Sequence, residues 1–153
     1  GLGREAFVTL PVAVLVGPQT TGSGELIAAA LQDNGRAVVV GQRTAGRGVM
    51  LSALDTRLPG RGYRLATGYT LRPNGKNRHR QPDAKPTDDW GVRPDRGYEV
   101  PVGRDVSEKL RAEAELQAVR RPGDRAAVAF DDPLADPQKL VAAKLLKERI
   151  NRK

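Results

Sequence analysis

Two short apolar runs, at residues 11–16 and 37–41, constrain the fold of this chain more than any other feature. Both are continuous and rich in β-branched residues, and a glycine closes each of them, which is typical of strands buried on both faces. Between them, residues 25–33 combine high helix propensity with an apolar face, and Asn34-Gly35 ends that helix. A strand, a helix and a strand within about 30 residues predict a βαβ unit whose two strands are parallel.

The middle of the chain predicts a pair of strands and a long loop. In chain order these are plausible strands at 49–53 and 64–71, broken by Pro59-Gly60, then a loop at 82–95 that holds the only tryptophan, Trp90, and then the short run 98–102.

The last third of the chain predicts two helices. Asp105 or Ser107 is the expected cap of a helix that continues to Val119, and Asp136-Pro137 gives a second helix a cap and a first-turn proline. An apolar stripe on that helix is expected to dock on the body of the protein; it consists of Val141, Leu145, Leu146 and Ile150. We therefore predict an α/β core over residues 1–102 and a helical C-terminal extension packed on it over residues 103–153.

Composition and charge limit the classes of function. The 153 residues include no cysteine and no grouping of His, Asp and Glu at metal-ligand spacing, so thiol chemistry, a metal site and a cofactor are not expected. The longest apolar stretch, residues 10–16, is far shorter than the roughly 20 residues of a membrane-spanning helix. The net charge is +8, and no acid lies between Asp55 and Asp83. A nucleic acid, or another anionic partner, bound through Arg57–Arg80 is therefore an alternative function.

Motifs spread over most of the chain resemble those of the C-terminal processing peptidases, also called tail-specific serine proteases. The matching segments, in chain order, are the polar turn that ends at Glu25 (family pattern S-A-S-A-S-E-I), residues 44–48 (T-F-G-K-G), residues 69–75 (Y-x-T-P-x-G), residues 91–95 (G-I-x-P-D) and residues 136–140 (D-P-Q-L).

The resemblance implies a fold, an activity and a class of partner. It implies a crotonase-like or ClpP-like α/β core that hydrolyses peptide bonds near protein C-termini with a Ser and Lys pair. The implied partners are peptides or unfolded protein C-termini, and the implied compartment of the parent protein is the bacterial cell envelope or periplasm. The family's upstream half, with a PDZ-like domain and a Gly-Gly turn that completes the oxyanion hole, has no counterpart in these 153 residues.

The sequence departs from the family pattern at both catalytic positions. Three residues before Glu25, the position of the family's nucleophilic serine is Gly22, and 25 positions further on the family's lysine is Arg47. Glycine has no nucleophilic oxygen, and arginine keeps its proton at neutral pH and cannot act as a base. We therefore expect a domain that is inactive or weakly active, in which Ser23, Gly24 and Arg47 bind substrate and Arg47 offers bidentate hydrogen bonds to a carboxylate.

Ser23 is the candidate replacement nucleophile. One residue along a helix rotates a side chain by about 100°, so Ser23 would point away from the nucleophile position unless the turn is rebuilt. The alternative is a helix cap whose hydroxyl accepts a backbone N–H. Lys76 or Lys85 could supply a base from a loop, although nothing in the sequence places either one near Ser23.

Overall fold

The computed structural model describes residues 9–55, 62–119 and 136–152. Within them the helices and strands are, in chain order, β1 (Ala13–Val16), α2 (Ser23–Asp33), β2 (Val38–Gly41), β3 (Val49–Asp55), β4 (Gly62–Tyr69), α3 (Arg104–Val119) and α4 (Pro137–Asn151). The mixed helix and strand content matches the α/β class expected from the sequence, and the segments predicted at 49–53 and 64–71 form β3 and β4.

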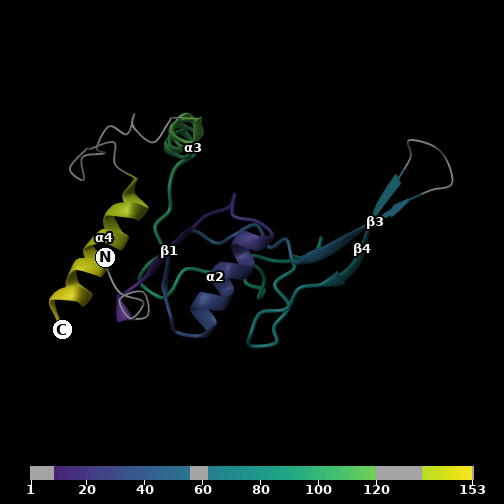
Figure 1. Ribbon diagram of the computed structural model, residues 1–153, viewed down its shortest axis with the longest axis horizontal. Coiled ribbons are helices and arrows are strands. Elements are labelled where there is room, and N and C mark those ends of the chain that lie inside the picture. The colour runs from purple at the N-terminus through teal and green to yellow at the C-terminus, as the bar shows by residue number, and fades with distance from the viewer. Residues whose placement is uncertain (1–8, 56–61, 120–135, 153) are drawn as a thin grey trace.

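The predicted βαβ unit is confirmed. β1 and β2 are paired in parallel from Ala13 opposite Val38 to Val16 opposite Gly41, with α2 as the connection between them. Helices α2 and α4 lie on opposite sides of this two-stranded sheet (Figure 1). The strand side chains therefore supply two cores. The prediction of burial on both faces is confirmed for β2, which is buried along its length, but is wrong for β1, where Leu15 is 36% exposed.

One core lies between the sheet and α2, and the other between the sheet and α4. The first contains Val16, Ala28, Ala29, Val39 and Val92. The second contains Val38, Val40, Ala142 and Leu145, with Val141, Tyr98 and other partly buried residues around it. The βαβ unit is therefore packed between two helices from distant parts of the chain.

Helix α4 begins as predicted, and only half of its apolar stripe docks. The Asp136 side chain accepts a hydrogen bond from the Gln138 N–H at 2.9 Å, and Pro137 is the first helical residue. Leu145 is buried, whereas Ile150 is 53% exposed, so the prediction that Ile150 docks is wrong. A helix of 15 residues is about 22 Å long and strands of four residues span about 13 Å, so the helix extends beyond the sheet that it covers.

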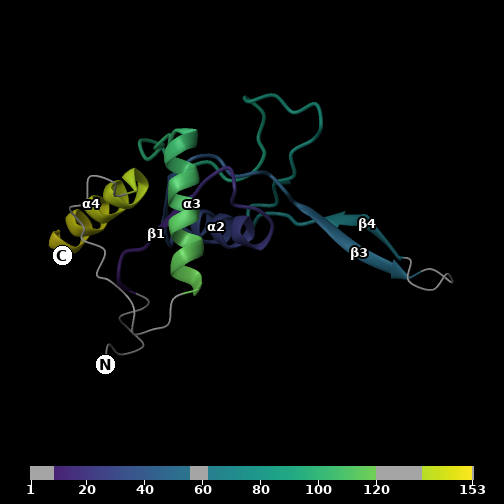
Figure 2. The ribbon, with the colours of Figure 1, turned by 90° about the horizontal axis from the view of Figure 1, so that it is seen from above.

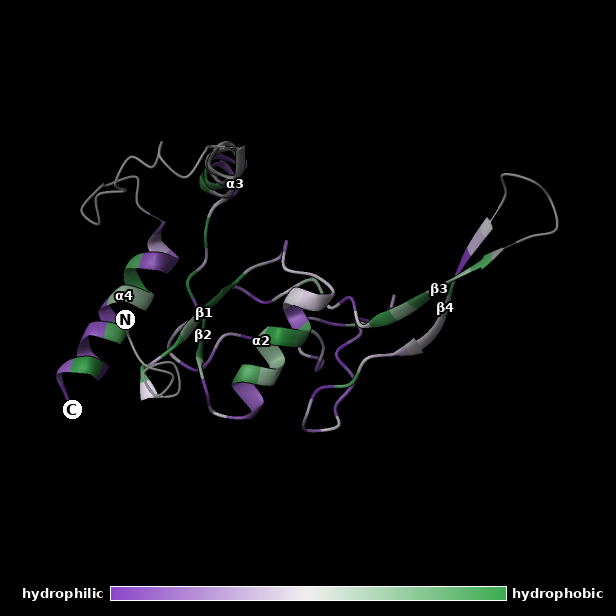
Figure 3. Ribbon diagram, viewed as in Figure 1, coloured by the Kyte–Doolittle hydropathy of each residue, from purple (hydrophilic) through white to green (hydrophobic). Residues whose placement is uncertain are grey.

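Strands β3 and β4 form an antiparallel ribbon that projects away from the rest of the described structure (Figures 1 and 2). A bulge interrupts the pairing between Met50 and Leu51. Figure 3 shows hydrophobic residues on this ribbon as well as on β1 and β2, and Met50, Leu51, Tyr63 and Leu65 are all more than half exposed. The ribbon is thus apolar without being buried by any residue that the structure describes.

Helix α3 starts earlier than the sequence suggested. Its first residue is Arg104, and the Ser107 N–H bonds to the Gly103 carbonyl, so Asp105 and Ser107 lie inside the first turn and the prediction that one of them caps the helix is wrong. An acidic Asp105 in that turn favours the helix through its dipole. In the described ranges no helix is long and apolar enough to cross a membrane. The domain boundary at residue 102 stays a prediction.

The short run at 98–102 pairs with β2 through one residue only. Gly41 donates to the Tyr98 carbonyl at 3.0 Å and accepts from the Val100 N–H at 2.8 Å, which forms an isolated parallel bridge at Glu99. This segment closes the outer edge of β2 at its carboxyl end.

Gly41 cannot be replaced without moving the backbone. Its φ is +128°, and an added Cβ would lie 2.1 Å from the Val16 carbonyl oxygen. We expect Gly41→Ala to lower the free energy of unfolding by about 2 kcal/mol, because it combines an unfavourable φ with overpacking. Urea unfolding followed by circular dichroism measures this. Gly17→Ala is the matched control, since nothing lies within 4 Å of its added Cβ; equal effects at both sites would contradict the argument.

A second prediction concerns the ion pair at the end of α2. Arg72 binds both carboxylate oxygens of Asp33, at 2.5 and 3.2 Å, and both side chains are largely buried. The hydrogen bond from Arg72 lowers the pKa of Asp33 below its ordinary value. The contribution of this ion pair to stability is therefore complete above the pKa of Asp33 in the unfolded chain, which is near 4. It is lost as the pH falls through the lower pKa that Asp33 has in the folded protein.

We expect Asp33→Asn to remove about 1–2 kcal/mol of stability at pH 6 and much less at pH 3. Denaturant titrations at the two pH values check this. Asp89→Asn is the control, because the Asp89 to Lys76 pair at 2.7 Å is exposed and such pairs contribute little. A loss for Asp33→Asn that is the same at both pH values would refute the assignment.

Candidate functional site

Gly22 occupies a turn immediately before helix α2 whose positive φ suits glycine. Its φ of 57° and ψ of −119° lie outside the regions that L-residues populate readily, and it is the N-cap residue of the helix. A Cβ built on Gly22 meets nothing within 4 Å. A side chain at this position would therefore project into open space at the positive end of the helix dipole.

The carboxylate of Glu25 joins this turn to the loop that follows β2. Glu25 is fully buried and accepts hydrogen bonds from five groups: the backbone N–H groups of Gly22 (3.1 Å), Gly46 (2.6 Å) and Arg47 (2.8 Å), the Thr44 hydroxyl (2.5 Å) and the Arg78 guanidinium (3.2 Å). The N–H groups of Gly22 and Arg47 bind the same oxygen, Oε2. The two positions that the resemblance assigns to the catalytic pair therefore donate their backbone N–H groups to one carboxylate oxygen.

Arg78 supplies the positive charge that balances Glu25. Its side chain is 3% exposed and also donates to the Arg47 carbonyl at 3.1 Å and to the Thr70 hydroxyl at 2.6 Å. Its Nε is buried without a hydrogen-bond partner. Removing either partner of a buried ion pair would leave the other charge unpaired and lower the stability of the protein. Arg78 and Glu25 therefore fix each other and hold the loop at Arg47.

Neighbouring segments hold the loop at residues 44–48 from its other sides. The Thr44 hydroxyl accepts from the Val92 N–H at 2.8 Å, and the Gly46 carbonyl accepts from the Arg80 N–H at 2.8 Å. The Ala45 N–H reaches back to the Thr20 carbonyl at 3.1 Å, in the turn before α2. The backbone of this loop is therefore fixed before any ligand binds.

The side chain of Arg47 is exposed, whereas its backbone N–H donates to the buried Glu25. It makes no hydrogen bond and no ion pair with any residue that the structure describes. The arrangement presents a guanidinium with unoccupied donors beside the start of α2, which is suited to a carboxylate or to the oxygen of a peptide carbonyl.

Ser23 and Gly24 lie in the first turn of α2. Ser23 is the first helical residue, is exposed, and its hydroxyl makes no hydrogen bond within the described structure. The alternative in which Ser23 caps the helix is therefore wrong, because Gly22 is the N-cap residue. The Lys76 amine bonds to Asp89 at 2.7 Å, and the exposed Lys85 side chain has no hydrogen bond or ion pair within the described part of the chain, so neither is paired with Ser23.

The basic residues of the Arg57–Arg80 stretch do not form one surface. Arg57 and Arg61 lie outside the described residues. The others are divided among different partners: Arg72 with Asp33, Lys76 with Asp89, Arg78 with Glu25, Arg80 over the ring of Trp90, and Arg64 exposed on β4. Three of these cations are therefore already neutralised within the protein.

Sequence reasoning missed the roles of Glu25, Arg78 and Thr44. Glu25 at the third helical position is the residue of a capping box, and its bond to the Gly22 N–H follows that pattern. The partner Arg78 is 53 residues away and gave no local signal. The described residues contain no group of three or more acidic, His or Cys side chains that could hold a metal ion.

Comparisons with known proteins identify the family of this chain. The sequence model of "Peptidase family S41" matches residues 3–96. Among curated proteins, the chloroplastic carboxyl-terminal-processing peptidase 1 of Arabidopsis thaliana is 37% identical over 71 residues, which are 46% of this chain and 14% of that protein. The carboxyl-terminal-processing protease of Synechocystis is 32% identical over 98 residues, which are 64% of this chain and 21% of that protein. The chain thus spans a minor part of the length of these relatives.

Two solved structures share the fold. The photosystem II D1 C-terminal processing protease superimposes with a TM-score of 0.50 and 27% identity, over 60% of this chain and 21% of that chain. Mature CPAF gives a TM-score of 0.52 and 21% identity over 90% of this chain and 21% of that chain, a similarity of fold alone. Because the family match covers more than half of the sequence and includes Gly22, Glu25 and Arg47, the chain belongs to peptidase family S41.

Proposed function

We propose that this chain is a serine-type C-terminal processing peptidase domain that binds peptide but hydrolyses it weakly or not at all. The observation that carries the proposal is the shared Glu25 oxygen, which brings the N–H groups of Gly22 and Arg47 to one point. At that point the residue in the nucleophile turn has no side chain, and the residue in the place of the base is a permanently charged arginine.

The chemistry that remains is recognition rather than bond cleavage. Acyl transfer needs an oxygen nucleophile and a group that removes its proton, and neither Gly22 nor Arg47 provides one. The exposed Arg47 guanidinium and the positive end of α2 attract an anionic or strongly polarised group, for which a peptide carboxylate is the natural ligand. Ser23 and Gly24 are the neighbouring residues that we propose to line this site.

The names of two relatives support protein C-termini as the ligand, and the parallel βαβ unit supports the proposed core fold. Two curated relatives are named for processing at the carboxyl terminus. We therefore propose protein C-termini as the partner class, and a crotonase-like or ClpP-like arrangement for the core to which β1, α2 and β2 belong.

Binding and cleavage of an unstructured protein with a C-terminal tag test the proposal. We expect no cleavage above background by mass spectrometry, and binding that falls at least tenfold in Arg47→Ala while tolerating 0.5 M salt, roughly the range in which purely ionic binding fails. Arg64→Ala is the matched control, because Arg64 is an exposed arginine on β4. Cleavage that is lost in Ser23→Ala would show instead that Ser23 is a working nucleophile.

A further inference from the structure

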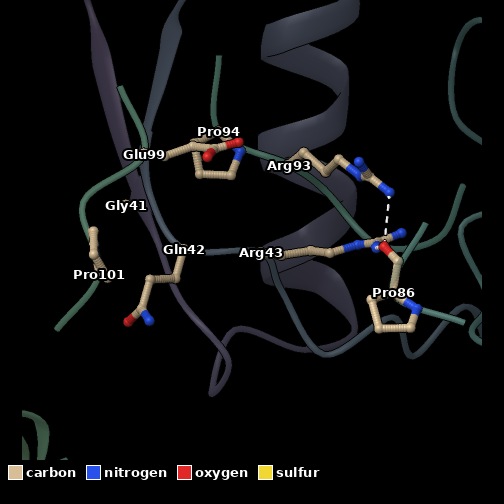
Figure 4. A pocket seen from close by; sticks show the side chains of 8 residues that line it. All are labelled: Gly41, Gln42, Arg43, Pro86, Arg93, Pro94, Glu99 and Pro101. Atoms are coloured by element: carbon tan, nitrogen blue, oxygen red, sulfur yellow. Dashed lines mark hydrogen bonds between the residues drawn. The ribbon is translucent and has the colours of Figure 1, made fainter. Parts of the chain in front are cut away.

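A pocket of about 330 Å³ lies at the carboxyl end of β2, apart from the groups that bind Glu25. The residues that line it are Gly41, Gln42 and Arg43 at the end of β2, together with Pro86, Arg93, Pro94, Glu99 and Pro101 (Figure 4). Its volume is at the lower end of the range for small-molecule sites, which suits a ligand of two or three amino-acid residues.

Two guanidinium groups meet at one end of this pocket. Arg43 and Arg93 both donate to the Pro86 carbonyl oxygen, at 2.7 and 3.1 Å. No carboxylate among the described residues lies within ion-pair distance of either group. Burial, and then repulsion from Arg93, lowers the pKa of Arg43 to about 10. Asp89 and Asp88 offset part of this repulsion, and the Pro86 carbonyl oxygen occupies the point between the two groups. A further anion would therefore bind at the Nε and Nη1 of Arg93, which have no partner among the described residues.

The protein holds Arg43 rigidly in place. Its Nε, Nη1 and Nη2 donate to the carbonyls of Trp90, Pro86 and Asp88, and its guanidinium carbon lies 3.4 Å from the centre of the Trp90 ring. Arg93 is less restricted, since only its Nη2 has partners among the described residues. Arg43 therefore supplies a fixed charge, and Arg93 supplies both charge and free hydrogen-bond donors.

The other end of the pocket has the opposite character. Figure 4 shows Glu99 and Gln42 toward one end and the two guanidinium groups toward the other. Glu99 disfavours a second anion there and favours an amine, and three prolines, which lack N–H groups, line the space with apolar surface. A ligand that matches this distribution carries a carboxylate at one end and a positive charge at the other.

We propose that this pocket binds the end of a short peptide, with its terminal carboxylate on the Nε and Nη1 donors of Arg93, beside Arg43, and its amine toward Glu99. The choice of a peptide rests on the proposed function, whereas the site itself needs no hydrolysis. Nothing in it depends on Arg47, so the two sites can be tested separately.

Calorimetric titration of the full chain with trialanine tests the proposal, and the fluorescence of the only tryptophan, Trp90, locates the binding. We expect trialanine to bind at least tenfold more tightly than trialanine amide, with a change in Trp90 emission because Arg43 covers its ring. Arg93→Gln is expected to weaken trialanine at least tenfold and Arg64→Gln to leave it unchanged. Arg47→Ala should also have no effect, which separates this site from the proposed function.

Glu99→Gln provides a second test that leaves the contacts of Arg93 in place. It should weaken trialanine severalfold and strengthen N-acetyl-trialanine, which lacks the amine. The proposal is overturned if inorganic phosphate binds as tightly as trialanine, or if the acid and the amide bind equally. It is also overturned if neither peptide binds at 10 mM, a concentration roughly a thousandfold above the dissociation constant of an ordinary specific ligand.

Discussion

Replacing Glu25 with alanine is expected to lower the free energy of unfolding by about 3–5 kcal/mol, enough to unfold much of the protein. The substitution would leave the buried Arg78 guanidinium without its counter-charge, and the N–H groups of Gly22, Gly46 and Arg47 without an acceptor. Urea denaturation followed by far-ultraviolet circular dichroism measures the loss.

The control for this experiment is Glu148→Ala, the same change at an exposed position of helix α4. We expect it to change stability by less than about 0.5 kcal/mol. A second comparison removes both charges: Glu25→Gln together with Arg78→Met should be more stable than Glu25→Ala, because no buried charge remains unpaired. A loss of under 1 kcal/mol for Glu25→Ala, on the scale of a surface change, would show that the hydrogen bonds around Glu25 are not holding the loop.

Restoring both catalytic side chains is expected to create a reactive serine. In Gly22→Ser with Arg47→Lys, the new hydroxyl would stand in open space at the start of α2, beside a lysine that can lose its proton. A fluorophosphonate probe should label this double variant roughly a hundredfold faster than Gly22→Ser alone, since a positioned general base contributes about 10²–10⁴ in rate. Labelling is measured by mass spectrometry of the modified peptide.

The natural chain, with glycine and arginine, should show only background labelling. Adding Ser23→Ala to the double variant should leave labelling unchanged, because Ser23 is not the residue that reacts. Serine at a φ of 57° should also cost about 1–3 kcal/mol of stability, which thermal melting would detect. A double variant that is folded but as unreactive as the natural chain would refute the assignment of Gly22 and Arg47 to the catalytic pair.

The parts of the fold that were predictable are those set by local pattern. Residues 37–41 are apolar throughout because helices cover both faces of β2, and this pattern is visible without knowing which helices do so. The start of α4 was predictable because Asp136 and Pro137 act within one turn. By contrast, the exposure of Ile150 depends on how far α4 extends past the sheet, which no local feature encodes.

The site divides in the same way. Gly22 and Arg47 could be identified from motifs, but the reason that they lie together could not. That reason is a carboxylate at Glu25 whose balancing charge, Arg78, comes from a segment 53 residues later. The sequence shows Arg78 only as one of several basic residues, and it is burial beside Glu25 that distinguishes it from the exposed Arg64.

Glu25 binds Gly22 and Arg47 through their backbone N–H groups only, so these hydrogen bonds do not require particular side chains at the two positions. Under the proposed function, an exchange of serine for glycine at position 22 would also relieve backbone strain at its positive φ. The proposed loss of the catalytic pair would therefore leave the hydrogen bonds of Glu25 in place, whichever of the two exchanges came first.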